Sequence, residues 1–108
     1  MPRPELCIKL ASPGEMRRLN RLYRGKDTAT DVLAFPLLTP RELSTRSKKH
    51  GILHLGDIII NRRDAKKKFL FLAVHGFLHL LGFDHERSSR EAKVMFTLQD
   101  EIINSMRD

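Results

Sequence analysis

Apolar residues alternate or run together in three short segments of the chain, a pattern that predicts three β-strands. Residues 5–10 alternate apolar and polar positions, with Ile8 and Leu10 on the apolar face, as expected for a strand with one buried face. Residues 31–35 form a second apolar segment. Residues 52–60 are almost continuously apolar, which favours a central place in a sheet.

Three helices are predicted between and after these strands. Residues 12–15 (Ser-Pro-Gly-Glu) and 88–91 (Ser-Ser-Arg-Glu) each place a serine three positions before a glutamate, which is the capping box that starts a helix. The first helix is expected to reach about Arg24, because Gly25 follows it. The apolar run 68–81 predicts the second helix, with a basic turn over residues 61–68 as its start. The last helix carries an apolar stripe of Val94, Met95, Leu98, Ile102 and Met106.

Residues 37–51 show no period and contain Pro40, Arg41, Arg46, Lys48, Lys49 and His50. We interpret them as a solvated loop, with a functional loop as the alternative.

The predicted elements follow the order β-α-β-β-α-α, which has too few helical crossovers for a doubly wound sheet. It predicts an α+β fold in which helices pack on a small mixed β-sheet. At 108 residues we expect one domain, residues 1–108, with a modest core.

The composition is that of a globular protein rather than a disordered or membrane-spanning one. Hydrophobic residues make up 41% and charged residues 31% of the sequence, and the longest apolar run is too short to span a bilayer. The single cysteine, Cys7, excludes an internal disulfide and fits a reducing compartment. No charged-then-apolar leader opens the sequence. We therefore expect a cytoplasmic protein with no membrane partner.

The net charge of +7 is unevenly distributed along the chain. Basic residues concentrate in residues 11–30, 41–50 and 61–70, whereas acidic residues outnumber basic ones from Asp84 onward. A concentration of basic residues in the part of the sequence before Asp84 favours a polyanion such as a nucleic acid as partner. The alternative is a merely soluble basic surface, because basic composition alone raises only non-specific affinity.

Three of the five histidines, His75, His79 and His85, lie within eleven residues. On a helix, His75 and His79 are one turn apart on one face, and a turn at Gly82 can return His85 to the same point. Imidazoles at this spacing predict a site for one divalent transition metal, with zinc the first choice. Three ligands without a fourth favour a catalytic rather than a structural site. The alternatives are hydrogen-bonded core histidines and a closed site with Cys7 as a distant fourth ligand.

The residues around the histidines suggest the chemistry. Gly76 occupies the place that glutamate, the general base, takes in the H-E-x-x-H motif of metalloproteases, which argues against a peptidase. Asp57 interrupts the apolar strand, and such a carboxylate needs a structural or catalytic partner. We consider Asp57 the acidic candidate for orienting water or a ligand. Asp84 is a candidate for accepting a hydrogen bond from a metal-binding histidine, through the ring nitrogen that does not bind the metal.

Three segments resemble the signatures of the YbeY family, bacterial endoribonucleases of ribosomal RNA maturation. The segment HGFLHLLGFDH (75–85) matches H-G-x-L-H-L-x-G-(Y/F)-D-H. The segments LNRLYRGKDTATDVLAFP (19–36) and LGDIII (55–60) resemble the second and third signatures. The similarity extends from about Ile8 to Ile103.

The resemblance implies a fold similar to that of zinc metalloproteases, shortened at the N-terminus, because members usually carry another strand and helix before this segment. It implies a single-strand-specific, metal-dependent endoribonuclease in rRNA processing, acting in maturation of the 3′ end of 16S rRNA and in ribosome quality control. Ribosomal RNA and the small ribosomal subunit would be the partners, without DNA. Arg24 matches the arginine that the family uses in catalysis. Metal-bound water would attack the phosphodiester while Arg24 stabilises the phosphate charge.

Two other functions stay open. One is a non-catalytic RNA-binding factor of ribosome assembly that keeps the metal for stability. The other is a metal hydrolase acting on another ester or amide, although Gly76 disfavours its peptidase form. The oligomeric state and the general base stay open as well.

Overall fold

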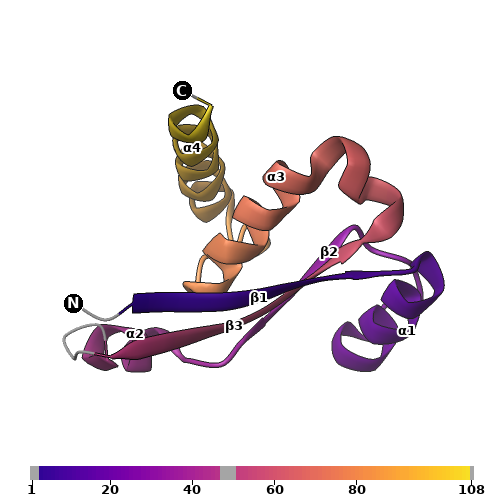
Figure 1. The fold of residues 1–108 in the computed structure, drawn as a ribbon, viewed down its shortest axis with the longest axis horizontal. Coiled ribbons are helices and arrows are strands. Elements are labelled where there is room, and N and C mark those ends of the chain that lie inside the picture. The colour runs from indigo at the N-terminus through magenta and orange to yellow at the C-terminus, as the bar shows by residue number, and fades with distance from the viewer. Residues whose placement is uncertain (1–2, 47–50, 108) are drawn as a thin grey trace.

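The computed structural model describes residues 3–46 and 51–107 and contains three strands and four helices (Figure 1). This confirms the predicted α+β class with a small mixed sheet. The elements in chain order are β1 (Arg3–Ala11), α1 (Pro13–Arg24), β2 (Val32–Pro36), α2 (Pro40–Arg46), β3 (Ile52–Asn61), α3 (Arg62–Leu80) and α4 (Ser89–Met106).

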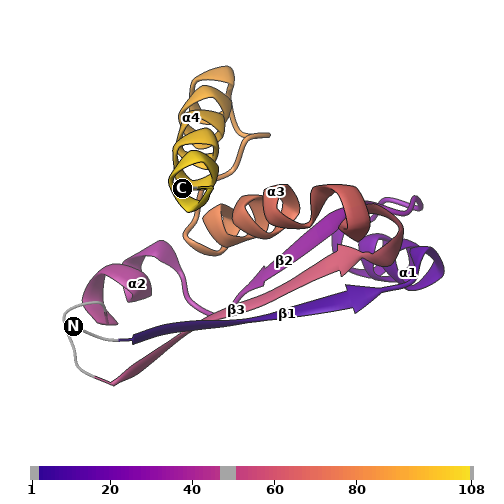
Figure 2. The same ribbon diagram turned by 45° about the horizontal axis from the view of Figure 1, so that its top comes forward.

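The sheet has the strand order β1-β3-β2, so the strand that was predicted to be central lies in the middle. β1 pairs with β3 in parallel and β2 pairs with β3 antiparallel. α3 lies across one face of this sheet, and α4 packs against α3 on the side away from the strands (Figure 2). α3, which is kinked at Lys68, and the three-stranded sheet are therefore the framework that positions the histidines.

The core lies between α3 and the sheet, and Gly76 permits their close approach. Ile58 and Ile60 of β3 are fully buried, and Leu72 of α3 is 1% exposed. A Cβ atom at Gly76 would lie 2.7 Å from Cγ2 of Ile58, closer than side-chain atoms can pack. A glutamate at this position would collide with the sheet. Packing of helix on strand is therefore a sufficient reason for glycine in the place of the metalloprotease base.

The apolar face predicted for the first strand is only partly buried. Ile8 and Leu10 pair with the fully buried Ile58 and Ile60 of β3, yet they are 38% and 51% exposed. The reason is the position of α3, which packs over β3 and β2 and scarcely reaches β1. Alternation predicted the strand correctly, but not how far the helix layer extends over it.

The prediction of a loop over residues 37–51 is wrong for its central part, which forms α2. The backbone N–H of Thr39 donates to Glu42 Oε1 at 3.1 Å, and the N–H of Glu42 donates to Thr39 Oγ1 at 3.2 Å. This reciprocal pair is a capping box, and the sequence Thr-Pro-Arg-Glu at residues 39–42 carries its signature. The remaining loop residues that we named, Lys48, Lys49 and His50, lie outside the described part of the chain.

The stripe predicted for the last helix is confirmed for Met95, and in part for Leu98 and Ile102, which are partly buried against the same core cluster. Met95 and Ile103 are buried against α3, whereas Val94 and Met106 are 46% and 60% exposed. The third buried residue of α4 is a polar one, Gln99.

Within residues 3–46 and 51–107, none of the helices combines the length and the hydrophobicity that a bilayer span requires. Similarity to the zinc metalloprotease fold stays a prediction.

Candidate metal centre

The three histidines come from the end of α3 and from the turn that follows it. α3 ends at Leu80, and Gly82 adopts a φ of +103° that reverses the chain. The N–H of Phe83 donates to the carbonyl oxygen of Leu78 at 3.1 Å, a bond typical of a glycine-terminated helix. This turn returns His85 to the helix face that carries His75 and His79, as the sequence predicted.

One potential ligand atom from each histidine lies within 4.8 Å of the others. Nε2 of His75 and Nε2 of His79 are 3.2 Å apart. Two nitrogens that each lie about 2.1 Å from a tetrahedral zinc ion are separated by about 3.4 Å. The spacing of these two atoms therefore fits a shared ion without rearrangement of the helix.

The protonation of the histidines also suits metal binding. Burial lowers the pKa of both His75 and His79 from the ordinary histidine value, because desolvation disfavours the charged imidazolium. A metal ligand must be neutral, so both rings are kept in the binding form. The Nδ1 atom of His85 is buried without a hydrogen-bond partner, and a buried nitrogen of this kind is available to bind a metal.

The sequence did not identify the residue that orients His75. Nδ1 of His75 lies 2.9 Å from Oε1 of Gln99, whose side chain is fully buried on α4. An amide oxygen only accepts hydrogen bonds, so Nδ1 carries the hydrogen and Nε2 is left to bind the metal. The sequence contained one signal for this role of Gln99: it is a polar residue four positions from both Met95 and Ile103, and therefore lies within the buried stripe of the helix.

Replacement of Gln99 by leucine is expected to weaken zinc binding about 10- to 100-fold, the usual effect of losing an outer partner of a ligating histidine. Competition with a chromophoric zinc chelator measures this change. The melting temperature of the metal-free variant is the control, because leucine also removes the unpaired buried Nε2 of Gln99. Unchanged zinc affinity in a folded variant would contradict this role.

The histidines open onto a cleft of about 830 Å³. It is lined by the end of α1, by the loop before β2 and β2 itself, by one face of α3 and by the turn after α3. The cleft also contains three carboxylates, Asp31, Asp84 and Glu86. A ligand in this cleft would thus meet the histidines on one wall and β2 with the end of α1 on the other.

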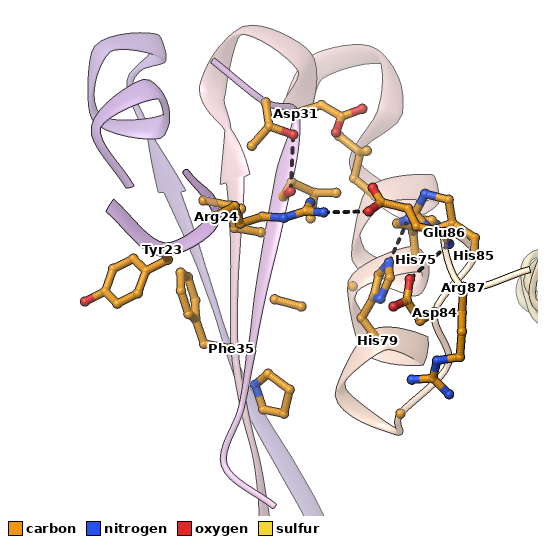
Figure 3. Close-up of a pocket in the computed structure, with 18 of the residues that line it drawn as sticks. Tyr23, Arg24, Asp31, Phe35, His75, His79, Asp84, His85, Glu86 and Arg87 are labelled. Carbon is orange, nitrogen blue, oxygen red and sulfur yellow. Dashed lines mark hydrogen bonds and ion pairs between the residues drawn. The ribbon is translucent and has the colours of Figure 1, made fainter. Parts of the chain in front are cut away.

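Arg24 faces the histidines across this cleft (Figure 3). It is the last residue of α1, and Gly25 ends the helix with a φ of +70°. Arg17 donates two hydrogen bonds to Asp27, at 2.9 and 3.0 Å, which hold the following loop against the helix. The structure therefore brings Arg24 together with His75, His79 and His85, four of the five predicted site residues.

Arg24 reaches the histidine turn through an ion pair with Glu86. Nη2 of Arg24 donates to Oε2 of Glu86 at 2.9 Å, and the two side chains are 40% and 47% exposed. This interaction lowers the pKa of Glu86. An exposed pair contributes at most about 1 kcal/mol to stability, so its main effect is to fix the guanidinium over the cleft.

Asp57 is not part of this arrangement. It is half-buried on β3 and lines a separate small pocket with Glu5, Cys7 and His54. Its neighbour Ile58 faces α3, and side chains alternate along a strand, so Asp57 faces the other side of the sheet. We therefore do not retain Asp57 as a site residue. Cys7 pairs with Asp57 on the neighbouring strand and lines the same small pocket, so it is not part of the histidine cluster either.

Asp84 lies in the cleft, but its carboxylate is used by the turn. Oδ1 of Asp84 accepts the backbone N–H of Glu86 at 3.0 Å, and this bond is the main reason why its pKa is lowered. Asp84 therefore shapes the turn that presents His85. Its charge also interacts with His79 and His85, so its predicted role beside a ligating imidazole stays a prediction, while His75 has Gln99 as its hydrogen-bond partner.

Comparisons with known proteins identify the family. The family profile described as "Endoribonuclease YbeY" matches residues 2–107. Proteins of that name from Persephonella marina and Leptospira interrogans are 41% and 39% identical to the chain, over 95% and 92% of its length and 71% and 84% of theirs. A solution structure from Thermotoga maritima is 31% identical, with a TM-score of 0.51 over 89% of this chain and 63% of that one. The chain therefore belongs to the YbeY family, whose named members are endoribonucleases.

Proposed function

We propose that this protein is a metal-dependent endoribonuclease that cleaves single-stranded RNA. We further propose that it acts in maturation of the 3′ end of 16S rRNA and in ribosome quality control, with the small ribosomal subunit as partner. The observation that carries the proposal is the placement of three converging histidines and Arg24 on opposite walls of one cleft. The names of the relatives support RNA as the substrate.

Each residue of the cleft has a distinct task in this proposal. His75, His79 and His85 would hold one divalent ion, with zinc the first choice. A bound ion of this type polarises a phosphoryl oxygen and lowers the pKa of water. Arg24 would donate two parallel hydrogen bonds to the phosphate and stabilise the charge that grows there. Glu86 would hold Arg24 in place until the phosphate replaces its carboxylate.

The charge distribution supports a polyanionic substrate. α1 and the first turns of α3 lie at the same end of the molecule (Figures 1 and 2). Exposed basic residues at the start of α3 include Arg62, Lys66, Lys67 and Lys68. Such a surface attracts the phosphate backbone of RNA and makes binding sensitive to salt.

The experiment is cleavage of an RNA that spans the 3′ end of 16S rRNA, offered single-stranded and as a duplex. We expect cuts only in the single-stranded form. RNA binding without cleavage at any metal concentration would overturn the proposal and favour the assembly factor. Turnover of small esters without affinity for RNA would favour the other metal hydrolase.

A further inference from the structure

Two phenylalanines are exposed at the histidine wall of the cleft. Phe71 of α3 and Phe96 of α4 are 42% and 40% exposed, and both line the cleft. The core between these helices is formed by other residues, among them Val74, Leu78 and Met95. Neither ring is therefore needed to join α3 to α4, and both present apolar area to whatever enters the cleft.

Both rings lie next to the candidate metal ligands. The ring centroids of Phe71 and His75 are 6.3 Å apart with planes inclined by 6°. Those of Phe96 and His75 are 6.0 Å apart with planes inclined by 23°. Phe96 also lies 5.8 Å from the ring of His85. The planes of both phenylalanine rings thus lie within 23° of the plane of the His75 ring, and both rings line the same cleft as the histidines.

We propose that Phe71 and Phe96 form a stacking site for a nucleobase of the RNA, next to the phosphate that is cleaved. This inference rests on the proposed function, because it extends the same cleft to the neighbouring nucleoside. Aromatic side chains bind unpaired bases by stacking, and they accept every base because each has a π-face. The site therefore favours single-stranded RNA over a duplex, whose bases are already stacked, and it selects little among sequences.

In this proposal the phosphate and the base of one nucleotide bind to different groups of the cleft, and the charges of those groups agree with it. Arg24 and the histidines provide cationic and metal-binding groups for the phosphate. The phenylalanines provide an uncharged surface 6.0 to 6.3 Å from His75, within reach of a base attached to a phosphate at the histidines. A phosphate clamp beside an aromatic surface is the usual combination in sites for single strands.

The test compares Phe71→Leu and Phe96→Leu with Phe69→Leu as matched control. Phe69 is 44% exposed on the same helix but does not line the cleft. Each protein is assayed on a single-stranded RNA and on the same RNA with one abasic residue next to the cleavage site, on either side in turn. We expect the two cleft variants to raise KM about tenfold on intact RNA with little change in kcat, and the control to change neither.

The abasic substrate distinguishes stacking from a general structural effect. For the wild-type chain, removal of the stacked base is expected to raise KM about tenfold as well. On that abasic RNA, Phe96→Leu should cause no further loss, because the two partners of one interaction are not additive. The chain contains no tryptophan, so Phe96→Trp introduces a single tryptophan, which can be excited selectively over Tyr23. Its emission should be quenched by intact RNA and not by the abasic RNA.

Each outcome decides one of the two proposals. If the wild-type chain cleaves RNA and the cleft variants behave like Phe69→Leu, or lose equally on intact and abasic RNA, the stacking site is wrong and the proposed function stands. If the wild-type chain does not cleave RNA, whether or not it binds it, the proposed function fails, and the stacking site next to the cleaved phosphate fails with it. Non-additive losses on intact and abasic RNA support both.

Discussion

Substitution of His79 by alanine is expected to abolish RNA cleavage and to weaken zinc binding by more than about 100-fold. The loss should exceed the 10- to 100-fold effect of removing a residue that only hydrogen-bonds a ligand, because His79 itself contributes one of the three converging nitrogens. Zinc affinity measured by chelator competition and the cleavage rate at saturating zinc test the two parts separately. Zinc affinity and the cleavage rate should fall together if the metal is required for the reaction.

His54→Ala is the matched control for this substitution. His54 is an exposed histidine on β3 that lines the small pocket on the other side of the sheet. Its removal is expected to leave zinc affinity and cleavage within about twofold of wild type, as is usual for exposed positions away from a site. Full cleavage by a His79→Ala chain would refute the metal centre as the site of reaction.

Substitution of Arg24 by alanine is expected to lower kcat about 10²- to 10³-fold, the usual effect of removing one donor to a developing oxyanion. Zinc affinity should not change, because Arg24 contacts Glu86 and not the histidines. Arg24→Lys should recover only part of the rate, since an ammonium group keeps the charge but lacks the planar fork that binds phosphate in two places. Single-turnover kinetics with saturating RNA measure the effect on the chemical step.

Arg21→Ala serves as the control for Arg24. Arg21 lies one turn earlier on α1, is 62% exposed and pairs with Asp27 at 3.8 Å, outside the cleft. We expect its loss to weaken RNA binding slightly, in proportion to one surface charge, and to leave kcat unchanged. An Arg24→Ala chain with the kcat of wild type would show that phosphate charge is stabilised elsewhere.

Local signals in the sequence predicted the parts of the site that depend on local geometry. The side chains of Ser12 and Ser88 accept the backbone N–H groups of Glu15 and Glu91, which is the N-cap half of each predicted capping box. The four-residue spacing of His75 and His79 is a property of any α-helix. Gly82 then fixes the turn toward His85 by its backbone alone. Each of these features depends on contacts within a few residues, which is why the sequence was sufficient.

Features that depend on the packing of distant segments were not predictable in this way. A strand that is apolar on both faces, such as residues 52–60, gives no alternation that would show which way Asp57 points. The ion pair between Arg24 and Glu86 joins residues 62 positions apart. Gln99 reaches His75 only because α4 packs on α3. These three facts required the arrangement of the elements in space.

The most direct test of the metal-centred account is a titration of metal-free protein with zinc, in which bound metal and RNA cleavage are measured on the same samples. The account predicts no cleavage by the metal-free chain. It also predicts a rate that rises in proportion to bound zinc and reaches its plateau at one ion per chain. Full cleavage by chain without metal, or binding of one zinc ion without any cleavage of single-stranded RNA, would contradict it.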